Sequence, residues 1–210
     1  MHENWVFGYG SLMWNPGFRF TERRRAVIHG YHRSLCMLSH MYRGTPDRPG
    51  LVLGLDIGGT CHGIAFKIAN ADWEETATYL RAREQVTNMY HELTKPVRLL
   101  ERSPPNARPG PDPGLLDFGD KGTPKEKAEP AEARLSDEAL KVPALFYAVN
   151  REHRQYAGRL SLEDQLHHVR QGHGQSGSCA DYVLNTVQHL REAGIRDHPL
   201  EKLAHALLKI

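Results

Sequence analysis

The chain has 210 residues, 40% hydrophobic and 25% charged, which is typical of a soluble globular protein, and its length favours a single domain over residues 1–210. Lys and Arg number 27 against 25 Asp and Glu, and a net charge of +2 gives no electrostatic reason to expect nucleic acid or an anionic membrane as a partner. The sequence has no apolar run near the roughly 20 residues of a membrane span and no secretion signal at its start, so we expect an intracellular protein.

The first third of the chain is predicted to form strands. Residues 4–9 combine aromatic and β-branched residues and end in Gly-rich sequence, and residues 29–40 alternate loosely between apolar and polar. The segments 51–57 and 61–68 flank Gly-Gly-Thr, which predicts a hairpin with a loop of about three residues.

A helix and a long exposed segment are expected next. The helix is predicted to begin after the capping residue Asp72 and to run to about Glu84. Residues 103–142 hold seven of the 13 prolines and many charges, so we expect a long exposed insertion that is partly disordered, with a short helix possible at 131–141. Strands are expected on either side of the insertion, at residues 95–101 and 143–149.

The last part of the chain is predicted to be helical. Ser161 begins a capping pattern with an acid three residues later, Gly194 suits a helix end, and Pro199 suits a first helical turn. Strands early and helices late, with one helix between, predict an α+β fold rather than a regular alternation. The three helices are expected at residues 161–171, 176–194 and 199–209.

The cysteine and histidine residues do not predict a metal or redox centre. The three cysteines are far apart, odd in number and free of any Cys-x-x-Cys pair, so we expect reduced, mostly buried thiols. The 13 histidines are scattered without an HExxH pattern, and no metal site is predicted. The cysteines are Cys36, Cys61 and Cys179.

The sequence Gly8-Tyr9-Gly10-Ser11-Leu12 follows the first predicted strand. It lacks the third glycine of a dinucleotide-binding loop, because Met13 occupies that place, and no Walker sequence follows. Two glycines at the end of a buried strand allow backbone N–H groups to point into a common space, which forms a nest for an anion such as a small carboxylate. A purely structural turn explains the same residues and stays an alternative.

Glu84 stands at the predicted end of a helix, directly after its apolar stripe. A carboxylate near the negative end of a helix and near a core is disfavoured as an anion, which raises its pKa toward the range of a general base. Arg81 or Arg83 would oppose this effect by folding back. The alternative is a solvated Glu84 paired with an arginine.

The sequence Gly174-Gln175-Ser176-Gly177 invites comparison with a serine hydrolase. A nucleophile elbow needs G-x-S-x-G between a strand and a helix, whereas this order is G-x-S-G with helical flanks. A helix N-cap at Ser176 or Ser178 is the better interpretation.

Several tyrosines occur near these segments, and a buried tyrosine is most often a core residue with a satisfied hydroxyl. Periodicity does not show which of them contact a substrate. They are Tyr9, Tyr90, Tyr147, Tyr156 and Tyr182.

Taken together and in this order, five segments resemble the ChaC family of γ-glutamylcyclotransferases. The resemblance implies a mixed α+β fold around a small closed β-barrel. It also implies cleavage of glutathione to 5-oxoproline and Cys-Gly, in the cytoplasm and without a cofactor. The segments are VFGYGSLMW (6–14), YRGTPDRPGLVLGL (42–55), HGIAF (62–66), YLRARE (79–84) and YAGRLSLEDQLHHVRQGHGQSGSCADYVLNTV (156–187).

The resemblance also implies roles for particular residues. Glu84 matches the catalytic acid/base, and Asn88 stands where many relatives have glycine. Because Asn tolerates the left-handed conformation better than most residues, we expect the turn at Asn88 to be kept. The γ-glutamyl group would bind to backbone amides of a turn formed by Tyr9, Gly10, Ser11 and Leu12.

The chemistry requires little from such an enzyme, since a γ-glutamyl compound carries its own nucleophile in the α-amine. Attack on the γ-carbonyl closes a five-membered ring, and one carboxylate suffices to move the proton. Three alternatives stay open: a relative that acts on other γ-glutamyl amino acids or on γ-glutamyl amines, a non-catalytic γ-glutamyl-binding module, and an interaction protein that works through residues 103–142.

Overall fold

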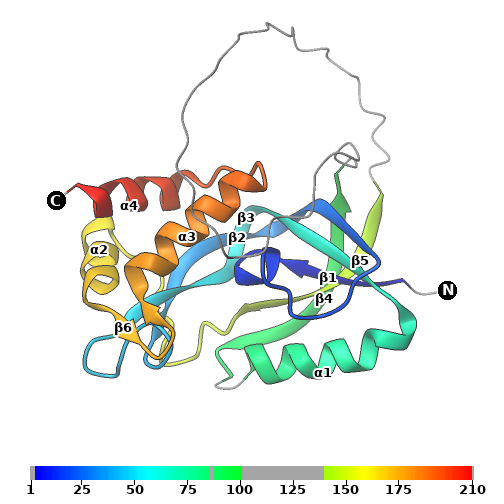
Figure 1. Ribbon diagram of the computed structural model, residues 1–210, viewed down its shortest axis with the longest axis horizontal. Coiled ribbons are helices and arrows are strands. Elements are labelled where there is room, and N and C mark those ends of the chain that lie inside the picture. The colour runs from blue at the N-terminus through cyan, green and yellow to red at the C-terminus, as the bar shows by residue number, and fades with distance from the viewer. Residues whose placement is uncertain (1–2, 86–87, 101–139, 210) are drawn as a thin grey trace, which may run out of the picture.

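The computed structural model describes residues 3–85, 88–100 and 140–209. Within these ranges five strands form a closed barrel in the order β1-β3-β2-β4-β5, and a parallel pairing of β5 with β1 closes it (Figure 1). The predicted α+β fold with a small closed barrel is therefore confirmed. The strands are β1 (Asn4–Gly8), β2 (Glu22–Ser39), β3 (Gly50–Ile68), β4 (Tyr90–Leu99) and β5 (Lys141–Val149).

The hairpin predicted from the segments 51–57 and 61–68 is wrong, because both belong to the single strand β3, which pairs with β2 from end to end. Gly58 and Gly59 have φ values of 100° and 72° and lie where the register with β2 shifts, close to Gly30 with a φ of 83°. They form a bulge that bends a long antiparallel pair. Glycine permits a positive φ in a turn and in a bulge alike, so the local residues do not distinguish the two.

Strands β2 and β4 begin earlier than predicted. The early part of β2 includes Arg23 and Arg24, whose guanidinium groups bond the backbone carbonyls of Met13 and Leu100. The first residues of β4 are mostly polar, and each of the first seven is partly buried or exposed. Charged strand residues with partners distant in sequence carry no local strand signal.

Four α-helices accompany the barrel in the described part of the chain. Helices α2, α3 and α4 contact one another, and α2 and α3 also contact β3, so the three cover one end of the barrel (Figure 1). Helix α1 lies along another side of the barrel, away from the α2–α4 group (Figure 1). The helices are α1 (Trp73–Glu84), α2 (Leu162–Gln171), α3 (Cys179–Glu192) and α4 (His198–Leu208). Short elements are the 3₁₀ turns η1 (Ser11–Met13) and η2 (Asn70–Asp72) and the strand pair β6 (His173–Gly174) and β7 (Gly177–Ser178).

The predicted helix starts are confirmed in part. Ser161 accepts a hydrogen bond from the Asp164 N–H at 3.1 Å, which is the predicted N-cap of α2. Asp72 precedes α1 but makes no cap, because its carboxylate pairs with Arg19 at 2.7 Å. Helix α4 has Asp197 as its N-cap residue.

One hydrophobic core joins the inside of the barrel to the helices. All three cysteines are buried and unpaired, as predicted. None of the described helices is long and apolar enough to cross a membrane.

Most of the predicted 103–142 insertion and of the helix at 131–141 lies outside the described residues, and Lys141 already belongs to β5. In the hydrophobic core, the largest fully buried side chains include Phe7, Phe66, Phe146, Tyr147 and Leu203.

Candidate active site

A tight turn leaves the buried strand β1 at Gly8. A Cβ at Gly8 would lie 3.0 Å from the Leu12 Cβ, so the turn closes this tightly because the residue is glycine. The turn continues into η1, where the Gly10 carbonyl accepts the N–H of Met13 at 2.9 Å. The N–H groups of Gly10, Ser11 and Leu12 donate to no other described residue, which leaves three backbone donors for a ligand.

The orientation of this turn depends on Arg33, a side chain in β2 that is only 4% exposed. Its Nε donates to the Tyr9 carbonyl oxygen at 2.5 Å and its Nη2 to the His62 carbonyl oxygen at 2.6 Å. Its Nη1 pairs with Asp197 Oδ2 at 3.0 Å. Because C=O and N–H point in opposite directions across a trans peptide, the Tyr9–Gly10 peptide directs the Gly10 N–H away from Arg33.

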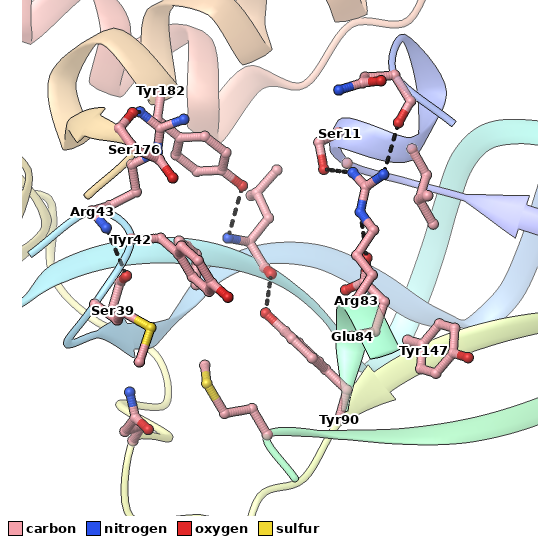
Figure 2. A pocket seen from close by; sticks show the side chains of 18 of the residues that line it. Ser11, Ser39, Tyr42, Arg43, Arg83, Glu84, Tyr90, Tyr147, Ser176 and Tyr182 are labelled. Carbon is pink, nitrogen blue, oxygen red and sulfur yellow. Dashed lines mark hydrogen bonds and ion pairs between the residues drawn. The ribbon is translucent and has the colours of Figure 1, made fainter. Parts of the chain in front are cut away.

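The end of α1 is tied to the same turn by Arg83 (Figure 2). Its Nη2 donates to Ser11 Oγ at 2.9 Å, and its Nη1 donates to the Asn15 carbonyl oxygen and to the Tyr79 hydroxyl, both at 2.9 Å. Its Nε lies 3.3 Å from Glu84 Oε1. Arg83 therefore fixes the distance between the turn and Glu84.

Glu84 is the last residue of α1, and its side chain is 18% exposed. Burial raises the pKa of this carboxyl, and the Arg83 charge opposes the shift. The structure thus combines the two interpretations from the sequence: Glu84 is paired with an arginine, yet it is largely withdrawn from solvent. Arg81 does not fold back, because it forms a bidentate pair with Glu92.

The chain after α1 turns at Asn88, which has a φ of 54°. This is the left-handed conformation expected for the residue that replaces glycine. The Asn88 carbonyl oxygen accepts a hydrogen bond from Asn150 Nδ2 at 3.3 Å, which ties the turn to the end of β5.

The turn and Glu84 face one cavity of about 810 Å³ (Figure 2). It is bounded by the end of α1, the loop after β2, the middle of β3 and one face of α3. The structure brings all five predicted site residues to this cavity: Tyr9, Gly10, Ser11, Leu12 and Glu84.

Four tyrosines surround Glu84, two of them buried and two partly buried. Burial raises the pKa of each hydroxyl, and the negative charge of Glu84 is a further cause for all four. A fifth tyrosine, Tyr42, lies on the cavity wall, whereas Tyr156 lies elsewhere and donates to Asp56 at 2.8 Å. The four are Tyr9, Tyr90, Tyr147 and Tyr182.

Two of these tyrosines differ in the hydrogen they can offer a ligand. The Tyr90 hydroxyl donates to the Leu53 carbonyl oxygen at 2.9 Å, so its hydrogen is used. The Tyr182 hydroxyl accepts the Leu53 N–H at 3.2 Å, which leaves its own hydrogen for a ligand oxygen. The middle of β3 therefore orients both rings at the cavity (Figure 2).

The serine-hydrolase comparison finds no support in the structure. Ser176 lies in the turn between β6 and β7, and its backbone carbonyl accepts a hydrogen bond from Arg43. Ser178 is the N-cap of α3 and accepts the N–H of Asp181 at 3.0 Å, which confirms the capping interpretation. Among the described residues, no group of three or more His, Cys, Asp or Glu side chains is placed to hold a metal ion.

The sequence does not predict the role of Arg33, the contact of Arg83 with the turn, or the basic residues at the far end of the cavity. Arg33 lies in a strand whose pattern shows only alternation, and its partner Asp197 is separated from it by most of the chain. Arg43 lies in the loop after β2, within the segment 42–55 that resembles the ChaC family, and the sequence alone predicts no role for it. The arginines carry no local signal, because their roles depend on contacts between distant segments.

Comparison with solved structures shows the class of fold. The crystal structure of a γ-glutamyl cyclotransferase specific to glutathione from yeast matches with a TM-score of 0.74 and 22% sequence identity, over 100% of this chain and 97% of that chain. The chain thus has the fold of that γ-glutamyl cyclotransferase.

The family follows from the sequence comparison. A family model described as ChaC-like protein matches residues 4–210, and the chain belongs to this family. The glutathione-specific gamma-glutamylcyclotransferase of Escherichia coli (strain K12) is 27% identical over 98% of this chain and 73% of its own length. Gamma-glutamylcyclotransferase 2-3 of Arabidopsis thaliana is 29% identical over 98% of this chain and 89% of its own length.

Proposed function

We propose that this protein is a γ-glutamylcyclotransferase that cleaves glutathione to 5-oxoproline and Cys-Gly. The observation that carries the proposal is that three residues with unpaired backbone N–H groups line the same cavity as one largely buried carboxylate. Family membership and the names of the relatives from Escherichia coli and Arabidopsis thaliana support it.

The turn provides the binding site for the γ-glutamyl group. The α-carboxylate accepts hydrogen bonds from the N–H groups of Gly10, Ser11 and Leu12, at the start of η1 where backbone donors are unpaired. The Ser11 hydroxyl accepts from Arg83 and keeps its own hydrogen, so it adds a fourth donor. A carboxylate held there places its α-ammonium group within the same cavity as Glu84.

Glu84 moves protons, one at a time, from the attacking nitrogen to the leaving group. As a carboxylate it takes a proton from the α-ammonium, and the free amine attacks the γ-carbonyl carbon to form the C–N bond of a five-membered ring. The old γ-amide C–N bond then breaks while protonated Glu84 gives its proton to the leaving nitrogen. The restored carboxylate takes the second hydrogen of the ring nitrogen and passes it to the amine of Cys-Gly, which leaves as an ammonium. The products are 5-oxoproline and Cys-Gly, and Glu84 returns to the carboxylate. The raised pKa of Glu84 makes it a stronger base toward the α-ammonium than a solvated carboxylate is.

A cytoplasmic location belongs to the proposal. It is supported by three buried cysteines that form no disulfide, the state that a reducing compartment maintains. Fractionation of cells that express a tagged chain tests it, and recovery of the chain outside the cytoplasmic fraction would contradict it.

The test of the function is release of 5-oxoproline from a panel of γ-glutamyl compounds by the purified chain. Glutathione, γ-glutamylalanine and γ-glutamyl-ε-lysine share the γ-glutamyl group and differ in the leaving amine. We expect the highest kcat/KM with glutathione, together with equal amounts of 5-oxoproline and Cys-Gly. Preference for another member would reassign the substrate, and no release from any of them would leave a binding module rather than an enzyme.

A further inference from the structure

The end of the cavity away from Glu84 contains a guanidinium group held in one orientation. Arg43 follows β2, and its Nη1 donates to the backbone carbonyl oxygens of Ser176 and Ser178, the latter at 3.2 Å. The guanidinium also lies over the Tyr182 ring, 5.1 Å from its centre. Figure 2 shows Arg43 and Ser39 on one side of Tyr182 and Tyr90, and Ser11, Arg83 and Glu84 on the other.

The remaining donors of Arg43 are free for a ligand. The two hydrogens of Nη1 are used by the two carbonyls, and neither Nε nor Nη2 bonds any other described residue. Nε and Nη2 form one edge of the guanidinium, with parallel N–H bonds that match the two oxygens of a carboxylate. Arg43 thus lines the cavity with a guanidinium edge that no other described residue uses.

Charge at this end of the cavity also favours an anion. Among the described residues that line the cavity, Glu84 is the sole carboxylate, and Arg83 already pairs with it. Arg43 and Arg154 line the cavity without an acidic partner in the described part of the chain. Burial, and after it the positive charge of Arg154, lowers the pKa of His40 at this end of the cavity.

We propose that Arg43 binds the carboxylate of the leaving group, so that the site selects γ-glutamyl peptides with a carboxylate at the far end from the scissile bond. This rests on the proposed function, which places the γ-glutamyl group at the turn. Glutathione has a carboxylate at each end, one for the Gly10–Leu12 amides and one for Arg43. A γ-glutamyl amine has only the first.

The experiment compares two substrates that differ only at the distant carboxylate: glutathione and its C-terminal amide, γ-glutamyl-cysteinyl-glycinamide. A charge-assisted, two-point contact gives wild-type protein at least about a tenfold preference in kcat/KM for glutathione, chiefly through KM. In Arg43→Gln the preference falls to about one, because kcat/KM drops for glutathione and changes little for the amide. Arg48→Gln, in the same loop but outside the cavity, keeps the wild-type preference.

The outcomes separate the inference from the function on which it rests. If Arg43 only supports the β6–β7 turn, Arg43→Gln lowers kcat/KM for both substrates equally, and that result would overturn the inference. Equal use of both substrates by wild-type protein overturns it while the proposed function stands. Absence of 5-oxoproline from both overturns the function and the inference together.

A second measurement uses wild-type protein alone and does not depend on the folding of a variant. Cys-Gly should inhibit glutathione turnover at least about tenfold more strongly than cysteinyl-glycinamide, since only the former carries the carboxylate. Equal inhibition by the two would contradict a carboxylate site at Arg43.

Discussion

Replacement of Arg33 by methionine tests whether a buried ion pair positions the substrate-binding turn. Methionine replaces the aliphatic part of the side chain without the charge, so the change leaves Asp197, whose side chain is 11% exposed, without its cation. It also removes the donors to the carbonyl oxygens of Tyr9 and His62. Loss of one partner from a buried pair costs about 3–5 kcal/mol, a large part of the about 5–15 kcal/mol by which a native protein is stable.

The assay is urea unfolding at neutral pH, with Arg19→Met as the matched control. Arg19 is 77% exposed and pairs with Asp72, and the loss of such a surface pair costs only about 0–1 kcal/mol. A double variant, Arg33→Met with Asp197→Asn, should be more stable than Arg33→Met alone, because it removes the unpaired buried charge and keeps an N-cap for α4.

Kinetics separate positioning from stability at temperatures where Arg33→Met is folded. Release of the Tyr9 carbonyl frees the Tyr9–Gly10 peptide to rotate, so KM for glutathione should rise for both the single and the double variant. The reasoning is refuted if Arg33→Met unfolds within about 1 kcal/mol of wild type, or if the folded variant keeps the wild-type KM.

Three further predictions concern protonation, thiols and the turn after α1. The acid limb of kcat/KM should have its midpoint above the ordinary range of a glutamate, because burial raises the Glu84 pKa and the base works only when deprotonated; a midpoint at the ordinary value would contradict this. Burial raises the pKa of Cys36 to about 12 and that of Cys61 to about 11, so iodoacetamide at pH 8 should label them slowly in native protein and rapidly in urea, and equal rates would contradict burial. Asn88→Val should unfold about 1–2 kcal/mol more easily than Asn88→Gly, because Asn88 has a positive φ; equal stability would exclude that conformation.

The parts of the fold that the sequence predicts well are those with local causes. Ser161 and the acid three residues later define a helix start through two neighbouring groups, and the structure contains that cap. The Gly8–Leu12 turn depends on close approach within five residues and is also predicted. Helix α1 ends at Glu84 as expected, and burial there raises the Glu84 pKa, the direction that the sequence predicts.

The parts that the sequence does not predict depend on partners elsewhere in the chain. Gly58 and Gly59 resemble a hairpin turn until the length of β2 is known, since only the partner strand shows that β3 continues through them. Arg33 and Asp197 meet across most of the chain, and neither has a neighbour in sequence that reveals the pair. The direction in which Arg83 folds, toward Ser11 rather than into solvent, likewise depends on how α1 packs.

The most direct test of the central claim is the turnover of Glu84→Gln with glutathione, compared with Glu74→Gln, an exposed change on the same helix. Glutamine keeps the shape of the side chain but cannot accept the ammonium proton. The account predicts a fall in kcat of about 10²–10⁴-fold for Glu84→Gln, with the urea midpoint at least as high as in wild type, and no change for Glu74→Gln. Near-normal release of 5-oxoproline by folded Glu84→Gln would contradict it.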